Sequence, residues 1–146
     1  MTTPPEWHEL PENPYNAHAW LVGEPLIGPG CWIGAFTVID GSGGLEIGAG
    51  CDVSAGAQIY SHSTVRRALN AGAAPVERAA TKLGDQVHVG AGAVILMGCE
   101  IGDRVVIGAG AVVPQFTVIP DDALAVGVPA RIIPGGASRY QGDDRA

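Results

Sequence analysis

A six-residue repeat runs along most of this chain, and it limits the possible folds more than any other feature of the sequence. The repeat is interrupted twice, before Ile47 and before Leu83, and its register then resumes. Of its fifteen first positions, fourteen are Leu, Ile or Val, although these residues are only 34 of the 146 in the chain. The positions are Leu21, Ile27, Ile33, Ile39, Ile47, Val53, Ile59, Leu83, Val89, Ile95, Ile101, Ile107, Val113, Ile119 and Ala125. Chance is a poor explanation for such a series.

Two other positions of the repeat support the same register. The fifth position holds small or compact residues throughout, including Cys31, Cys51 and Cys99, which we expect to behave as small buried hydrophobes. The second position is often glycine, as at Gly28, Gly34, Gly48, Gly84, Gly90, Gly102 and Gly108, which suits a tight corner. A short strand and a corner every six residues would point the first position inward, so that stacked parallel coils bury an aliphatic column. A period of six does not match the 3.6 residues of a helical turn, and the recurring glycines would interrupt simple alternating strands.

Three segments resemble the hexapeptide-repeat (isoleucine-patch) acyltransferase family. They read LIGPGCWIGAFTVI, EIGAGCDVSAGAQIYSH and QVHVGAGAVILMGCEIGDRVVIGAGAVV. The resemblance implies an all-β fold, a three-sided left-handed parallel β-helix, and a homotrimer with active sites between neighbouring prisms. It divides the chain into an N-terminal extension (1–20), the β-helix (21–133) and a C-terminal tail (134–146).

The two interruptions of the repeat are candidates for function. Two extra residues in 39–46 widen one corner, which is either a plain turn or a device that brings Asp40 or Ser42 near the acceptor pocket. Residues 65–82 do not carry the repeat, which predicts a loop that leaves the prism. Long loops in compact domains are often functional. In the family that the chain resembles, a loop here covers the neighbouring subunit's site.

His62 stands at the last repeat before that loop, and it matches the family's catalytic histidine. Acyl transfer from a thioester needs a base that takes the proton of the attacking hydroxyl or amine. Imidazole titrates near neutral pH and suits this task. We therefore predict that His62 is the general base, while the sequence leaves the group that orients it unidentified.

The resemblance also implies where the acyl donor, acyl-CoA and most commonly acetyl-CoA, would bind. The expected contacts lie in the C-terminal coils, at Gly108, Ala109, Ala111, Ala125, Gly127 and Arg131. Arg131 would lie near the CoA phosphates, which a guanidinium suits. His88 is a further candidate for lining the substrate site, and the acceptor is expected to be a sugar or nucleotide-linked sugar.

Composition excludes several other classes of function. The chain carries 8 Lys+Arg against 15 Asp+Glu, and this acidic balance argues against nucleic-acid binding and against docking on an anionic membrane. No apolar run is long enough for membrane insertion, and no signal peptide is recognisable, so a cytoplasmic location is expected.

Two rival functions on the same fold are weighed against acyl transfer. A γ-type carbonic anhydrase would need three histidines around zinc, but two of the expected positions hold Ala91 and Leu96, so no metal is expected. A non-catalytic trimeric scaffold would need neither His62 nor the loop.

Overall fold

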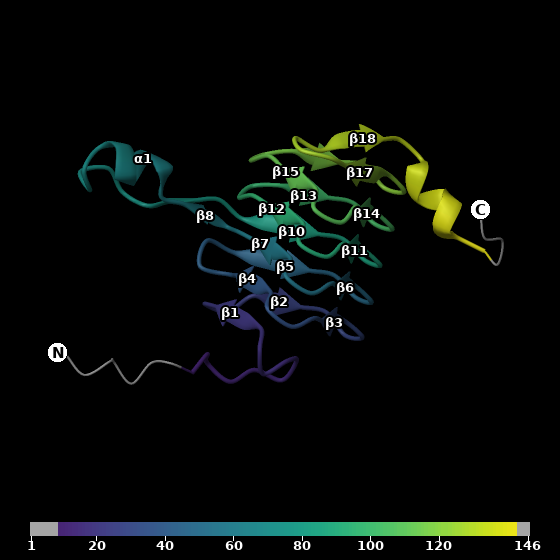
Figure 1. Cartoon of the computed structure of the whole chain (residues 1–146), viewed down its shortest axis with the longest axis horizontal. Coiled ribbons are helices and arrows are strands. Elements are labelled where there is room, and N and C mark those ends of the chain that lie inside the picture. The colour runs from purple at the N-terminus through teal and green to yellow at the C-terminus, as the bar shows by residue number, and fades with distance from the viewer. Residues whose placement is uncertain (1–8, 143–146) are drawn as a thin grey trace.

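The computed structural model describes residues 9–142 as a three-sided stack of short strands (Figure 1). The first sheet contains β1 (Trp20–Val22), β4 (Val38–Asp40), β7 (Gln58–Ile59), β12 (Val94–Ile95) and β15 (Val112–Val113). The second contains β2 (Leu26–Ile27), β5 (Leu45–Ile47), β10 (Thr81–Leu83), β13 (Glu100–Ile101) and β16 (Val118–Ile119). The third contains β3 (Trp32–Ile33), β6 (Asp52–Val53), β11 (His88–Val89), β14 (Val106–Ile107), β17 (Leu124–Val126) and β18 (Arg131–Ile133). The predicted parallel β-helix is confirmed, while its left-handed sense stays a prediction.

The strand register confirms the repeat residue by residue. On the first sheet, each first-position residue pairs with its counterpart in the next coil: Leu21, Ile39, Ile59, Ile95 and Val113. The other two sheets align their first positions in the same way. These side chains form the buried core, apart from the partly exposed Leu21 and Ile27 in the first coil. Each buried aliphatic side chain contributes about 2 kcal/mol to folding.

The inward fifth position is also confirmed, with two shifts at the interruptions. Cys51 and Cys99 are buried, as expected for this position, whereas Cys31 in the first coil is only partly buried. After each interruption, the residue two places before the next first position fills the core, so Leu45 and Thr81 are buried there. Gly43 and Ser63, which the uninterrupted count would place inward, are only partly buried.

The second-position glycines were expected to supply the tight backbone of the corners, but the structure gives them a different role. The second-position glycines are needed for close approach of the coils: a Cβ on Gly90 would lie 2.5 Å from the backbone nitrogen of Ala109. The left-handed conformation falls instead on the fourth position of the repeat. Glycine occupies it in some corners, such as Gly110 with φ +69°, but Phe36 and Arg104 also adopt it.

One segment leaves the stack, and we call residues 62–79 the arm. Its stem pairs β8 (His62–Ser63) with β9 (Glu77–Arg78) in antiparallel register, and α1 (Val65–Leu69) lies near its tip (Figure 1). The predicted loop 65–82 therefore leaves the stack at His62, and the chain has re-entered the second sheet by Thr81.

The C-terminal coil ends in a strand of opposite direction. β18 pairs antiparallel with β17, and the 3₁₀ helix η1 (Gly136–Tyr140) follows it. Within residues 9–142, no helix is both long and apolar enough to cross a membrane.

Candidate active site

His62 lies where the arm leaves the corner between the first and second sheets. A fourth-position residue would normally turn the corner, but His62 instead begins the extended strand β8. Its imidazole Nδ1 is hydrogen-bonded to Oδ2 of Asp40. About a third of the His62 side chain (31%) stays exposed, whereas that of Asp40 is buried. The imidazole is thus held from behind and open to solvent on its other side.

The Asp40 carboxylate is enclosed by donors from two coils. Its Oδ1 accepts a hydrogen bond from the backbone N–H of Ser42 at 3.0 Å. Its Oδ2 accepts one from the backbone N–H of Ser61, also at 3.0 Å, in addition to its contact with His62. The Ser61 hydroxyl donates to the backbone carbonyl of Asp40 at 2.7 Å. This network fixes the carboxylate in one orientation under the imidazole.

The donors around Asp40 keep it ionised despite its burial. Burial by itself raises the pKa of Asp40, but the hydrogen bonds from Ser61, Ser42 and His62 outweigh it and lower this pKa from 3.8 to about 2. An ionised carboxylate only accepts hydrogen bonds, so the Nδ1 of His62 must carry the shared proton. In the neutral imidazole, Nε2 then has a free lone pair and can act as a base.

This arrangement supplies what the sequence left open about His62. The wide corner 40–46 does lie at the site, and Ser42 approaches the imidazole, with its Oγ 3.4 Å from Nδ1 of His62. Asp40, however, is fully buried, so its side chain has no surface for an acceptor. We therefore remove Asp40 from the substrate-contacting candidates, because its carboxylate faces His62 and backbone donors.

Gly43 is the residue that lets the wide corner close over Ser61. Its backbone N–H donates to the Ser61 hydroxyl at 2.8 Å. A Cβ on Gly43 would lie 2.0 Å from the backbone oxygen of Ser61, which is far inside a tolerable contact. A side chain here must push the corner away from the strand that leads to His62.

The variant Gly43→Ala is therefore expected to lower kcat at least about tenfold and to destabilise the fold by about 1–3 kcal/mol, as overpacking does. Kinetics and thermal unfolding measure the two effects. The control is Gly92→Ala, where no atom lies within 4 Å of the added methyl group and only the left-handed backbone (φ +68°) adds a strain of about 1 kcal/mol, so it should keep wild-type kinetics. Wild-type kinetics and unfolding for Gly43→Ala would show that the corner does not hold the dyad.

Tyr60 is a site residue that the sequence reasoning missed. Its ring lies edge-on to His62, with the ring centroids 5.9 Å apart. Its hydroxyl donates to Oε1 of Gln58 at 2.7 Å. Burial, followed by the charge of Asp40, raises the pKa of Tyr60, so the phenol stays neutral. An aromatic residue two places before the candidate base was the available signal.

A second group of predicted residues lies on a separate groove. This groove has a volume of about 460 Å³ over β11 and β14. It brings together His88, Gly108 and Ala109, and Tyr140 from η1 adds a wall that the sequence did not predict. His88 therefore lies with the residues expected to contact CoA and not beside the His62 of its own chain.

The remaining CoA candidates divide by exposure. Gly127 and Arg131 are exposed at the turn between β17 and β18 and at the start of β18. Ala111 and Ala125 are fully buried in the core column, and their backbone carbonyls accept hydrogen bonds from Val94 and Gly108. We therefore remove these two alanines from the candidate CoA surface, because neither offers atoms to a ligand.

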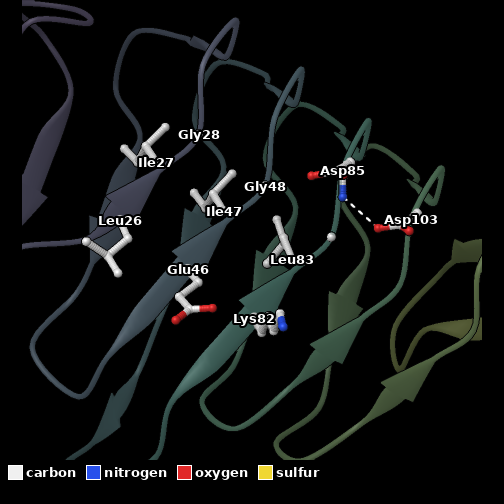
Figure 2. Close-up of a pocket in the computed structure, with 11 residues that line it drawn as sticks. Leu26, Ile27, Gly28, Glu46, Ile47, Gly48, Lys82, Leu83, Asp85 and Asp103 are labelled. Carbon is white, nitrogen blue, oxygen red and sulfur yellow. Dashed lines mark hydrogen bonds between the residues drawn. The ribbon is translucent and has the colours of Figure 1, made fainter.

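Another groove, of about 490 Å³, lies on the second sheet over β2, β5 and β10 (Figure 2). Its polar lining includes Glu46 and Lys82, and Asp85 and Asp103 lie at one edge. There the backbone N–H of Asp85 donates to Oδ1 of Asp103 at 2.8 Å, which ties adjacent coils together. No histidine or cysteine lines this groove, so it offers no imidazole base for acyl transfer.

Two further kinds of chemistry find no support in the part of the chain that the structure describes. Burial raises the pKa of Cys51 to about 11 and also raises that of Cys99, so these thiols stay protonated at neutral pH. Among residues 9–142, no group of three His, Cys, Asp or Glu side chains is arranged to hold a metal ion.

Comparison with known families gives two matches within the chain. Residues 80–115 match the family described as bacterial transferase hexapeptide (six repeats). Residues 26–61 match the family described as hexapeptide repeat of succinyl-transferase. No curated protein sequence matches the chain.

Solved structures of acyltransferases share this fold. The N-acyltransferase AntD from Bacillus cereus, in complex with dTDP and 3-hydroxybutyryl-CoA, is 26% identical with a TM-score of 0.68, over 82% of this chain and 66% of AntD. An AntD mutant bound to dTDP-4-amino-4,6-dideoxyglucose and coenzyme A gives 26% identity and a TM-score of 0.71, over 82% of this chain and 67% of the mutant. A maltose O-acetyltransferase from Clostridium difficile 630 is 30% identical with a TM-score of 0.61, over 80% of this chain and 58% of that enzyme. The chain thus spans about two thirds of AntD and less of the maltose enzyme.

Proposed function

Because the chain belongs to the hexapeptide-repeat acyltransferase family, we propose that it transfers an acyl group, most simply acetyl, from acyl-CoA to a small acceptor. The observation that carries the proposal is the buried, ionised Asp40 carboxylate hydrogen-bonded to the partly exposed imidazole of His62. A non-catalytic scaffold has no use for a buried carboxylate directed at an accessible imidazole.

The proposed reaction uses His62 first as a base and then as an acid. Its Nε2 takes the proton of the acceptor hydroxyl or amine as the acceptor oxygen or nitrogen attacks the thioester carbonyl carbon. The carbonyl electron pair moves to oxygen, giving a tetrahedral oxyanion. Collapse of this intermediate re-forms the carbonyl and breaks the carbon–sulfur bond. The departing CoA sulfur takes the proton from Nε2, which leaves the ester or amide and free CoA thiol.

Asp40 supports both proton transfers without itself changing charge. Its carboxylate holds Nδ1–H, which keeps Nε2 free as the base, and it stabilises the imidazolium while that cation exists. The wide corner 40–46 and Ser61 hold the carboxylate in place. The chain thus uses one interruption of its repeat to orient the base and the other, the arm, to carry it.

The separation of His62 from the groove over β11 and β14 supports an active site built from two copies of the chain. His62 stands at the corner between the first and second sheets, whereas Gly108 and Ala109 follow β14 at the corner between the third and first. The two corners are opposite edges of the first sheet. A donor held at the groove over β11 and β14 would meet the His62 of a neighbouring prism in the homotrimer that we propose.

The acceptor in this proposal is a sugar or a nucleotide-linked sugar. The N-acyltransferase AntD was crystallised with dTDP-4-amino-4,6-dideoxyglucose, and a related structure is a maltose O-acetyltransferase. Both an amine and a hydroxyl acceptor therefore fit the same His62 chemistry.

Acetyl-CoA is expected to raise the melting temperature if it binds the folded protein. At one hundred times its Kd, binding adds about 2.7 kcal/mol, equivalent to roughly 5–10 °C for a chain of this size. Differential scanning fluorimetry measures the shift, with ATP at the same concentration as the control ligand. No shift at saturating acetyl-CoA would favour the scaffold.

The groove over β11 and β14 offers a matched pair of variants for the same measurement. Ala109→Tyr adds a large ring to that groove and is expected to abolish the shift. Ala55→Tyr adds the same ring at an equivalent exposed corner position in an earlier coil and is expected to retain it. Equal shifts for both variants would place the donor elsewhere.

A further inference from the structure

Arg78 is the cation closest to the candidate base in the strand register of the arm. In the stem, Arg78 on β9 is directly opposite His62 on β8. Directly opposed residues of an antiparallel pair project from the same face of the ribbon. The wide corner confirms which face this is, because a Cβ on Gly43 would lie 3.1 Å from the Cβ of Arg78. Arg78 and His62 therefore share the side of the ribbon that faces the corner.

Arg78 is also available to a ligand. It is exposed, and no salt bridge within residues 9–142 involves its guanidinium. The neighbouring carboxylate Glu77 lies 3.7 Å from Arg66 and projects from the other face of β9. The stem thus presents a free guanidinium beside the base and directs its one carboxylate elsewhere.

The arm differs in charge from the rest of the chain. It carries three arginines and one glutamate, a net charge of +2, whereas the remainder of the chain has a net charge of −9. A hollow of about 430 Å³ next to the wide corner is lined by Glu24, Glu46 and Glu100 with Lys82 as its only cation. An anionic group near His62 would be repelled from that hollow and attracted to Arg78.

We infer that Arg78 determines specificity by binding an anionic substituent of the acceptor, a phosphate or carboxylate, while His62 deprotonates the reacting hydroxyl or amine. A guanidinium binds such oxyanions through two parallel hydrogen bonds, which fixes orientation as well as affinity. The inference rests on the proposed function and narrows it, since a neutral sugar offers Arg78 no partner. A nucleotide-linked sugar or a sugar phosphate does.

The test separates acceptor binding from donor binding. Calorimetry first measures CoA binding, and dTDP is then titrated into protein saturated with CoA, so that the donor's own phosphate sites are filled. Thymidine serves as the uncharged arm, and glucuronate distinguishes a carboxylate from a phosphate. The variants are Arg78→Gln and, as a matched control on the same arm, Arg67→Gln.

Arg78→Gln is expected to weaken dTDP or glucuronate binding on the order of 10-fold to 100-fold, as loss of a charge-assisted hydrogen-bonded pair does. Arg67→Gln should bind the anion as wild type does. In both variants, CoA binding and the unfolding temperature should stay near the wild-type values. Wild-type binding of the anion should also weaken with added salt. The kcat/KM for glucosamine 6-phosphate, divided by that for glucosamine, should fall in Arg78→Gln and not in Arg67→Gln.

Four outcomes would overturn the inference while leaving the proposed function intact. The first is that wild type binds CoA but not the anion, and the second is that Arg67→Gln and Arg78→Gln weaken anion binding equally. The third is that Arg78→Gln lowers kcat/KM equally for charged and neutral acceptors. The fourth is that Arg78→Gln weakens the binding of CoA alone. Absence of both CoA binding and acyl transfer would instead overturn the proposed function itself, and this inference with it.

Discussion

The variant His62→Ala is expected to lower kcat for acyl transfer by about 10²-fold or more, the usual contribution of a positioned general base. The KM for acetyl-CoA should change little, because CoA is proposed to bind in the groove over β11 and β14, and His62 of the neighbouring prism would meet only the reacting thioester. The imidazole is about one-third exposed and lies outside the buried core, so folding should survive its loss. Release of free CoA thiol in the presence of a sugar or amino-sugar acceptor measures the rate.

A second histidine variant shows whether the loss is specific to His62. His18→Ala removes an imidazole that lies against Phe36, with ring centroids 5.8 Å apart, and that has no carboxylate partner among residues 9–142. It should keep wild-type turnover and should unfold at a similar temperature. If His62→Ala turned over as fast as His18→Ala, His62 would have no role in the chemistry.

The sequence predicts the stack well because each side chain of the repeat has one structural task. Ile95 and its counterparts must point inward, and the six-residue spacing alone makes that visible. The reason for the glycines was harder to predict. Whether Gly90 is needed for its backbone conformation or for space depends on the distance to the next coil, which the period does not contain.

The pairing of Asp40 with His62 was not predicted because it depends on the register between coils. Ile39 pairs with Ile59, twenty residues away, because the wide corner adds two residues to the coil. This places Asp40 beside Tyr60, two residues before His62. A signal was present, because Asp40 is the only charged residue at a second position of the repeat.

Replacing Asp40 by asparagine is expected to lower kcat by about 10²-fold or more with little change in the KM for acetyl-CoA. An asparagine amide can donate a hydrogen bond to Nδ1 of His62. The proton then moves to Nε2, and the imidazole can no longer accept the acceptor's proton there. The control is Asp52→Asn on β6, an exposed carboxylate for which no hydrogen bond or salt bridge is found among residues 9–142. It should retain wild-type kinetics.

The acid stability of the same variants tests the state of the Asp40 carboxylate. Its pKa is lowered from 3.8 to about 2 in the folded protein, so its ionised form favours folding above about pH 4. As the pH falls from about 4 to about 2, wild type should lose up to roughly 2 kcal/mol from this one group. Denaturant unfolding at several pH values measures the loss, which Asp52→Asn should keep and Asp40→Asn should lack. If Asp40→Asn and wild type lost stability in parallel over this range, the carboxylate would not be ionised under His62, and the assignment of Nε2 as the base would fail with it.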